Sequence, residues 1–145
     1  MKPILYYVDD DPEDLDIFSL AAATLNVDLH LFSEPVKMLA KIDASPVKPD
    51  IIFIDFKMTM ISGSDVIIIL RANNFKMPII VLSTSSDEDD IKTAYNLGAN
   101  DFITKPRRLI NLTAAIRHTL NWNWSIRPTS TARRCSRRSP RATTR

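Results

Sequence analysis

Residues that could carry chemistry stand directly after short apolar runs. Asp9 and Asp10 follow the run Ile4–Val8, and Asp55 follows residues 51–54, where four large apolar residues come in succession. An unbroken run of this kind, bounded by loop residues, predicts a strand buried on both faces of a parallel sheet. A lone aspartate at a strand end most often closes a turn, so the other strand ends decide whether these carboxylates have a further role.

Two more apolar runs end in polar groups. Ser83 and Thr84 follow residues 78–82, and Lys105 follows residues 101–104. The carboxyl ends of parallel strands lie along one edge of the sheet, where open α/β sheets bind their ligands. We therefore expect three carboxylates, a hydroxyl and an ammonium group to meet at this edge.

The electrostatics of such a site indicate a bound cation. Two carboxylates about 4 Å apart repel each other by about 4 kcal/mol at an effective dielectric constant of 20. Three carboxylates in one cleft therefore favour Mg²⁺, which prefers oxygen ligands. A carboxylate beside a metal-held phosphoryl group can act as a nucleophile and form an aspartyl phosphate. Lys105 would offset charge on the phosphoryl oxygens, and Ser83 could hydrogen-bond to one of them.

The elements that must position these groups alternate along the chain. Each strand is followed by apolar residues at helical spacing, which gives strand then helix five times over. Short links between alternating elements predict an α/β fold with a doubly wound parallel sheet, right-handed crossovers and helices on both faces. The first helix is expected to begin at Pro12, after the N-cap Asp11, and to end at Asn26. The apolar residues expected on the inner face of the second helix are Val36, Leu39, Ala40 and Ile42.

Composition divides the chain into an acidic body and a basic end. The 145 residues are 45% hydrophobic and 25% charged, which is ordinary for a soluble globular protein. Residues 127–145 hold seven Arg and no acidic residue, which leaves 12 basic and 17 acidic residues, a net charge of −5, in residues 1–126. We expect one domain over residues 1–124 and an Arg/Ser/Thr-rich tail over residues 125–145 that is disordered or not native to the protein.

The basic tail has one alternative interpretation. It could bind a nucleic acid or an anionic membrane, but it has no aromatic residue and no regular spacing for reading a groove. The single cysteine, Cys135, excludes an internal disulfide, which is consistent with a cytoplasmic location. No apolar stretch approaches the ~18 residues of a membrane span, and the first residues are not a signal peptide.

The body of the chain resembles a response-regulator receiver domain of two-component signalling, from residue 3 to about residue 122. The resemblance rests on the strand-end motifs and on the segment before the lysine, namely Val8-Asp9-Asp10, Ile54-Asp55, Leu82-Ser83, Lys105-Pro106 and Asn96-Leu97-Gly98-Ala99-Asn100-Asp101-Phe102. It implies a flavodoxin-like (βα)5 sheet with the strand order 2-1-3-4-5. It also implies that Asp55 accepts a phosphoryl group from a histidine kinase or a phosphotransfer protein.

Further roles are implied by the resemblance. The Mg²⁺ ligands would be Asp9, Asp10, Asp55 and the backbone carbonyl of Lys57. Lys105 would be the catalytic lysine, Ser83 the switch hydroxyl and Phe102 the switch aromatic. The Lys105–Pro106 peptide bond would be cis, which X-Pro bonds adopt at modest cost.

A receiver of this kind would be a phosphorylation switch. It would hydrolyse its own aspartyl phosphate and would not be a turnover enzyme on an external substrate. The remaining length leaves no room for an output domain, so we expect a stand-alone regulator that signals by contact with a downstream protein and does not bind DNA. The last two helices and the last strand are the expected contact face, through which the chain could also form a homodimer.

The sequence departs from the family pattern near the phosphoacceptor. The loop after Asp55 often reads Met-Pro and later Asp-Gly in the family, whereas this chain has Met58-Thr59 and Ser62-Gly63. The side chain of Lys57 is expected to be solvated, because its flexible stem lets the ammonium reach water. Thr84 replaces a smaller residue that is frequent in the family and could narrow access to the phosphoryl group. These departures predict unusual dephosphorylation kinetics.

Two other functions compete with this interpretation. A phosphatase of the haloacid-dehalogenase type also uses a strand-end Asp-x-Asp pair, which Asp9 and Asp11 would supply, but Pro12 and the absence of a second acidic motif after Lys105 count against it. That enzyme would also leave Asp55 without a role. A flavodoxin-like cofactor carrier would need a hydroxyl- and glycine-rich phosphate loop after the first strand, where this chain has aspartates instead.

Overall fold

Five strands and five helices alternate through residues 2–125, the part of the chain that the computed structural model describes. The strands are β1 (Ile4–Val8), β2 (Asp28–Phe32), β3 (Ile51–Asp55), β4 (Ile79–Ser83) and β5 (Asp101–Thr104). The helices are α1 (Pro12–Ala22), α2 (Pro35–Ala44), α3 (Gly63–Ala72), α4 (Glu88–Leu97) and α5 (Leu109–Asn121). The predicted α/β class and the order of its elements are confirmed.

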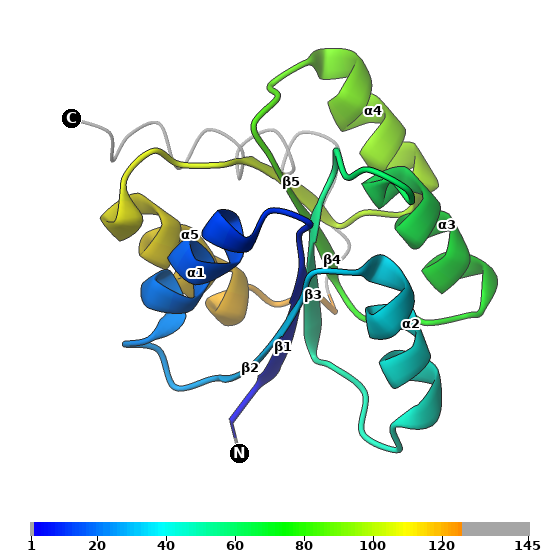
Figure 1. Cartoon of the computed structure of the whole chain (residues 1–145), viewed down its shortest axis with the longest axis horizontal. Helices are drawn as coiled ribbons and strands as arrows, with labels where there is room; N and C mark the ends of the chain where they lie inside the picture. The colour runs from blue at the N-terminus through cyan, green and yellow to red at the C-terminus, as the bar shows by residue number, and fades with distance from the viewer. Residues whose placement is uncertain (1, 126–145) are drawn as a thin grey trace.

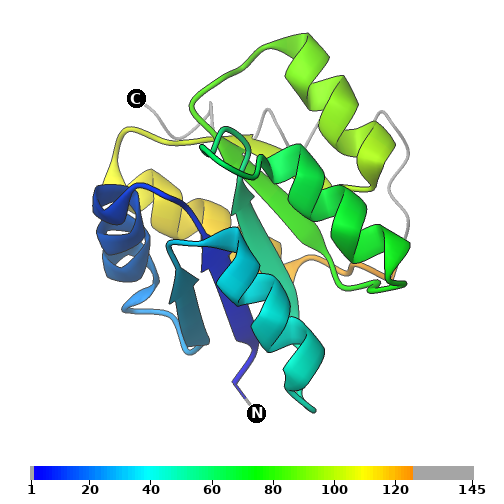
Figure 2. The same cartoon turned by 45° about the vertical axis from the view of Figure 1, so that its right-hand side comes forward.

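The strands form one parallel sheet in the order β2-β1-β3-β4-β5, as the resemblance implied. Figure 1 shows α1 and α5 on one face of this sheet and α2, α3 and α4 on the other, and the turned view in Figure 2 shows the same layers. The register sets Val8 beside Ile54 and Asp55 beside Leu82, so that β1, β3 and β4 end at nearly the same level. Side chains that follow these strands are therefore brought to one edge.

The sheet is covered by a separate apolar core on each face. Toward α2, α3 and α4 the core contains Tyr6, Val8, Met38, Ile42, Ile52, Ile54, Val66, Ile67, Leu70, Ile91, Ala94 and Phe102. Toward α1 and α5 it contains Leu5, Tyr7, Phe18, Ala21, Ala22, Phe53, Ile80, Leu82, Leu112, Ala115 and Ile116. All residues of β3 are buried, because this central strand has a helix layer on each side.

Three helix ends carry the capping residues that are typical of such positions. Asp11 is the N-cap of α1 and accepts a hydrogen bond from the backbone N–H of Glu13, with Pro12 at the first helical position. Ser62 forms a capping box with Asp65 at the start of α3. Gly98 ends α4 with φ 117°, a left-handed conformation that glycine adopts without steric cost.

Two details of the predicted helices are wrong. Helix α1 ends at Ala22 instead of Asn26, because the chain turns back toward β2 through hydrogen bonds from Leu25 N to Ala22 O and from Val27 N to Leu25 O. In α2 the residues expected inside include Val36 and Ala40, which are exposed, whereas Met38 is fully buried. The helix presents Pro35, Met38 and Ile42 to the sheet, at spacings of three and four, and this places the two mispredicted residues on its outer side.

The basic tail and the capacity of the helices to span a membrane are the remaining points predicted from the sequence. The Arg/Ser/Thr-rich tail falls almost entirely outside the described residues, so the predicted boundary at residue 124 stays a prediction. Within residues 2–125, none of the helices has the length and apolar character needed to cross a bilayer.

Candidate functional site

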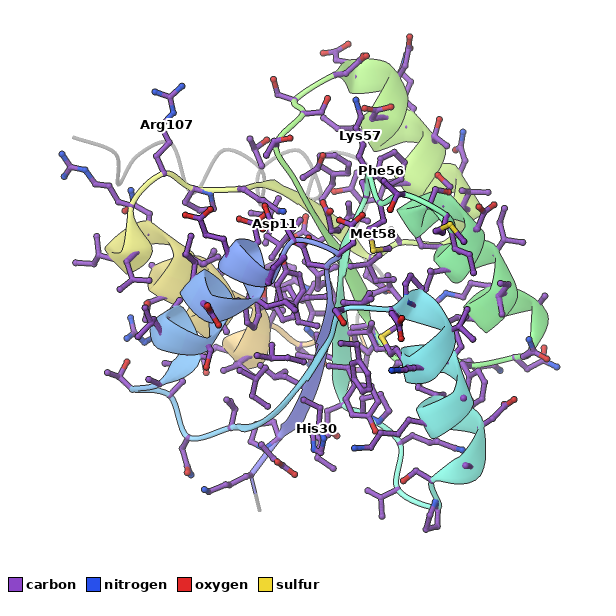
Figure 3. All side chains as sticks on the ribbon, viewed as in Figure 1. Asp11, His30, Phe56, Lys57, Met58 and Arg107 are labelled. Atoms are coloured by element: carbon purple, nitrogen blue, oxygen red, sulfur yellow. The ribbon has the colours of Figure 1, made fainter. Side chains whose placement is uncertain are left out.

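Residues from separate strand ends meet at the carboxyl edge of the sheet. Each of Asp9, Asp10 and Asp55 offers a carboxylate oxygen, and these oxygens all lie within 4.8 Å of one another. Figure 3 shows the neighbouring residues Asp11, Phe56, Lys57 and Met58 gathered at this edge, with His30 toward the other end of the sheet. The predicted convergence is what the parallel topology produces, since β1 and β3 are adjacent and end together.

Lys105 supplies the positive charge of the site. Its Nζ lies 2.8 Å from Asp9 Oδ2, 2.7 Å from Asp14 Oδ2 and 3.4 Å from Asp55 Oδ1. Burial disfavours the charged ammonium, but hydrogen bonds to Asp14 and Asp9 outweigh burial and raise the pKa of Lys105 above its ordinary value. The lysine therefore stays protonated at neutral pH.

Asp9 is the most enclosed carboxylate of the site. It is fully buried and accepts hydrogen bonds from Tyr7 Oη at 2.5 Å and from the backbone N–H of Asp11 at 3.0 Å. Burial and the hydrogen bond to Asp9 raise the pKa of the Tyr7 phenol, so it remains a donor. Tyr7 is not among the site residues predicted from the sequence, although residues two apart on an extended strand share a face, so its spacing to Asp9 could have indicated the contact.

Asp10 and Asp11 have different partners. Asp10 Oδ2 accepts hydrogen bonds from the backbone N–H of Thr59 at 2.9 Å and from its hydroxyl at 3.0 Å. This contact ties the loop after β1 to the loop after β3. Asp11 Oδ1 accepts a hydrogen bond from Glu13 N at 2.9 Å and so caps α1. A dehalogenase-type phosphatase would need the carboxylates of Asp9 and Asp11 in the same site, and here the Asp11 carboxylate is at the helix cap instead.

Asp55 lies at the end of β3 and is 7% exposed. Burial and the charge of Asp9 raise its pKa to about 7, while Lys105 opposes the increase. The start of α3 packs closely here, because a Cβ on Gly63 would lie 2.7 Å from both Asp55 O and Phe56 Cα. Only glycine fits at this position, and its N–H donates to Phe56 O at 3.0 Å, which fixes the backbone beside the carboxylate.

Ser83 and Phe102 lie where the resemblance expects switch residues. Ser83 is 1% exposed, and its Oγ accepts a hydrogen bond from Ser85 N at 3.1 Å. Phe102 is also 1% exposed and packs edge-on against Phe56, with ring centroids 5.9 Å apart. Because Phe56 directly follows Asp55, only the Phe56 side chain separates the Phe102 ring from the end of the strand that carries Asp55.

The loops beside the site hold the two residues expected to affect access. Lys57 is 65% exposed, as expected, and its Nζ lies 3.6 Å from Asp90 Oδ2 on α4; Figure 3 shows it on the outer side of the loop. Thr84 is exposed directly after Ser83. The expected cis bond between Lys105 and Pro106 is wrong: the described residues contain no cis peptide bond, and this bond has the trans form that X-Pro amides modestly favour.

The donor set fits a small divalent cation. Opposite oxygen ligands of Mg²⁺ are roughly 4 Å apart, close to the 4.8 Å that contains the three carboxylate oxygens. Asp9 and Asp10 would hold such an ion together with Asp55. The ammonium of Lys105 lies against Asp9 and Asp55, so it neutralises only part of the negative charge.

A family comparison agrees with this geometry. The model of the response regulator receiver domain matches residues 5–117. The chain belongs to the response regulator receiver domain family. It is thus a receiver domain of two-component signalling, and such domains are signalling modules that generally do not turn over a substrate. Membership of this family excludes the haloacid-dehalogenase and cofactor-carrier interpretations.

Curated relatives of the receiver are longer regulators. MtrA of Mycolicibacterium smegmatis, a DNA-binding response regulator, is 26% identical over 123 residues, which are 85% of this chain and 53% of MtrA. PrrA of Mycobacterium leprae, a transcriptional regulatory protein, is 35% identical over 78 residues, which are 54% of this chain and 34% of PrrA. The chain thus spans about half the length of MtrA and about a third of PrrA.

Solved receivers share the fold over most of the chain. The phosphorylated cyanobacterial phytochrome response regulator RcpA superposes with a TM-score of 0.75 at 25% identity, covering 89% of this chain and 98% of RcpA. A response regulator in red light signalling of R. palustris superposes with a TM-score of 0.76 at 25% identity, covering 88% of this chain and 99% of that protein. The Mn²⁺-bound form of response regulator Rcp1 superposes at 0.71 with 20% identity, covering 88% of this chain and 99% of Rcp1, which shows the common fold alone.

Proposed function

We propose that this receiver accepts a phosphoryl group on Asp55 from a histidine kinase or a phosphotransfer protein. The observation that carries the proposal is the position of Asp55 at the end of the central strand, with two further carboxylates and the Lys105 ammonium around it. Asp55 is not sealed from solvent, because its side chain is 10% exposed, whereas Asp9 is fully buried. Of these two carboxylates, both in contact with Lys105, Asp55 is therefore the one that an incoming phosphoryl group can reach, whereas Asp10 is hydrogen-bonded to Thr59.

The transfer uses an oxygen of Asp55 as the nucleophile. This oxygen forms a bond to phosphorus while the bond from phosphorus to the donor nitrogen breaks, and its electron pair returns to the donor imidazole. A pKa of about 7 leaves a substantial fraction of Asp55 ionised at neutral pH. Lys105, 3.4 Å from Asp55 Oδ1, offsets charge on the phosphoryl oxygens. Mg²⁺, held by Asp9, Asp10, Asp55 and the carbonyl of Lys57, would supply further positive charge for those oxygens.

Phosphorylation changes the contacts of Ser83 and Phe102. The Ser83 oxygen accepts from Ser85 N, and its hydroxyl hydrogen can be donated to a phosphoryl oxygen. Movement of Ser83 toward Asp55 alters the space at the end of β4, next to which β5 and Phe102 lie. The surface of α4, β5 and α5 then changes, and this face contacts a downstream protein or a second copy of the chain.

Lys57 and Thr84 tune the lifetime of the aspartyl phosphate. Both are exposed in loops that follow the strands of Asp55 and Ser83. Receiver variants Lys57→Asn and Thr84→Ala are expected to differ from the parent in the half-life of the phosphoryl group, followed by loss of mass after the donor is removed. Unchanged half-lives in both variants would contradict this role.

Intact-mass measurement tests the main proposal. The full chain is treated with acetyl phosphate and Mg²⁺, and the expected result is a mass increase of one phosphoryl group in the parent and none in Asp55→Asn. Asp11→Asn, which alters an exposed helix cap, is the matched control and should still be phosphorylated. Equal uptake by Asp55→Asn would refute Asp55 as the acceptor.

A further inference from the structure

Asp14, on the first turn of α1, is the carboxylate closest to the lysine of the site. Its Oδ2 is 2.7 Å from Lys105 Nζ, compared with 2.8 Å for Asp9 and 3.4 Å for Asp55. An ammonium group has three N–H donors, and hydrogen bonds to Asp14 and Asp9 use two of them. The lysine is therefore drawn toward α1 and makes only the longer contact with the phosphoacceptor.

The contact is more than an ordinary surface ion pair. The side chain of Lys105 is 15% exposed and that of Asp14 is 31% exposed, so water screens the two charges only in part. An acidic residue near a helix N-terminus is favourable without any partner, but Glu13 in the same turn already meets that preference. The helix dipole therefore does not explain why the Asp14 carboxylate accepts a hydrogen bond from Lys105, 91 residues away in the sequence.

We propose that Asp14 is a positioning residue that holds the Lys105 ammonium off Asp55 and so keeps the Asp55 oxygens available for the cation and the phosphoryl group. The inference rests on the proposed function and deepens it. Without the Asp14 carboxylate, the free N–H donor of Lys105 would turn to Asp55. The ammonium would then compete with Mg²⁺ for oxygens of Asp9 and Asp55, since both cations need the same acceptors.

Titration calorimetry of the full chain with MgCl₂ alone, without a phosphodonor, tests this role. Asp14→Asn is expected to weaken Mg²⁺ binding by about fivefold to tenfold, a coupling typical of groups in one charge network. Asp16→Asn removes the same formal charge from an exposed position on the same helix and should change the affinity by less than about twofold. Equal losses in these two variants would overturn the inference, as would a parent that binds no Mg²⁺.

A double-mutant cycle separates positioning from a simple charge effect. If Asp14 acts through the lysine, Asp14→Asn in a Lys105→Met background should change Mg²⁺ affinity by less than about twofold. An equally large loss with and without Lys105 would overturn the inference.

A conservative variant gives an answer even if Lys105→Met does not fold. Asp14→Glu keeps the carboxylate and should restore the affinity to within about threefold of the parent, a difference of less than about 1 kcal/mol. Binding as weak as in Asp14→Asn would contradict the proposed role. None of these titrations involves phosphorylation, so a parent that fails to phosphorylate on Asp55 refutes the proposed function, and only the Mg²⁺ affinities decide the role of Asp14.

Discussion

Each end of the sheet holds one positively charged side chain, and the groups around the two side chains differ in charge. At the amino end, the Arg71 guanidinium donates to Phe75 O, Met77 O, Gly98 O and Asn100 Oδ1 at distances of 2.7 to 3.1 Å. All of these acceptors are neutral. At the carboxyl end, Lys105 lies among the carboxylates of Asp9, Asp14 and Asp55, with Asp10 beside them.

The difference separates a structural network from a functional one. The donors of Arg71 are all matched, and they join the end of α3 to the loops that enter β4 and β5. A Cβ on Gly98 would lie 2.9 Å from Arg71 Cγ, so the backbone packs directly against the arginine side chain. At the other end three carboxylates contact one ammonium and Asp10 lies beside them, and this excess of negative charge raises the pKa of Asp55 and favours the binding of a further cation. Three substitutions test this contrast.

Arg71→Ala should have the largest effect on stability. Loss of the guanidinium removes the side-chain donor of the Phe75, Met77 and Gly98 carbonyl groups and leaves Asn100 Oδ1 with Ile79 N alone. We expect a decrease of about 3 kcal/mol in the free energy of unfolding. Urea denaturation measures this change. Arg107→Ala is the matched control, because Arg107 is exposed and points away from the body in Figure 3; it should change stability by less than about 0.5 kcal/mol. Similar losses in both variants would contradict the structural role of Arg71.

Asp55→Asn should stabilise the metal-free protein. The pKa of Asp55 is raised from 3.8 to about 7, so the folded state binds a proton that the unfolded state has released between these values. The parent therefore loses stability as the pH rises from about 4 to about 7, and the variant does not. We expect the free energy of unfolding of the variant to exceed that of the parent by about 2 kcal/mol at pH 8. This is less than the full pKa shift of Asp55 implies, because asparagine also loses the attraction to Lys105.

Denaturation in EDTA at pH 5 and pH 8 measures this gain. The advantage of Asp55→Asn should be small at pH 5 and larger at pH 8, and added Mg²⁺ should reduce it by stabilising the parent. An advantage that shrinks as the pH rises would show that the carboxyl end carries no excess of negative charge.

Lys57→Asn should have the smallest effect on stability. The Lys57 side chain is 65% exposed and 3.6 Å from Asp90, so solvent screens the pair and its loss should cost about 0.5 kcal/mol. Thermal denaturation at low and high salt measures this effect, which should vanish at high salt. A loss above about 1.5 kcal/mol would mean that the buried Asp90 Oδ2 depends on this lysine for its stability.

Most of the fold was predictable because each strand is a short apolar run followed by a helix with its own start and stop signals. The mistakes came from details that apolar spacing leaves open. In α2 Met38 faces the sheet and Val36 faces solvent, the reverse of what was expected for Val36. The apolar residues of this ten-residue helix are compatible with either face, so their spacing alone does not show which one is buried. The end of α1 is set by the turn toward β2 and not by Asn26.

The site was predictable where its residues directly follow strands. Asp9, Asp55 and Lys105 meet because parallel strands end together, which a sequence pattern can indicate. Asp14 was missed because it stands on a helix, and its partner is determined by how α1 packs beside the loop after β5. Tyr7 was missed because it lies within an apolar run, where an aromatic residue is expected to pack, and nothing in that run indicates that its hydroxyl donates to Asp9.

The central claim is that the phosphoryl group is bonded to Asp55 in a site completed by Asp9, Asp10 and Lys105. The most direct test treats the phosphorylated chain with borohydride, which reduces an aspartyl phosphate to homoserine, and then locates the altered residue by peptide mass spectrometry. We predict homoserine at position 55, formed only when Mg²⁺ was present during phosphorylation. Homoserine at position 9, or equal modification without Mg²⁺, would contradict the account.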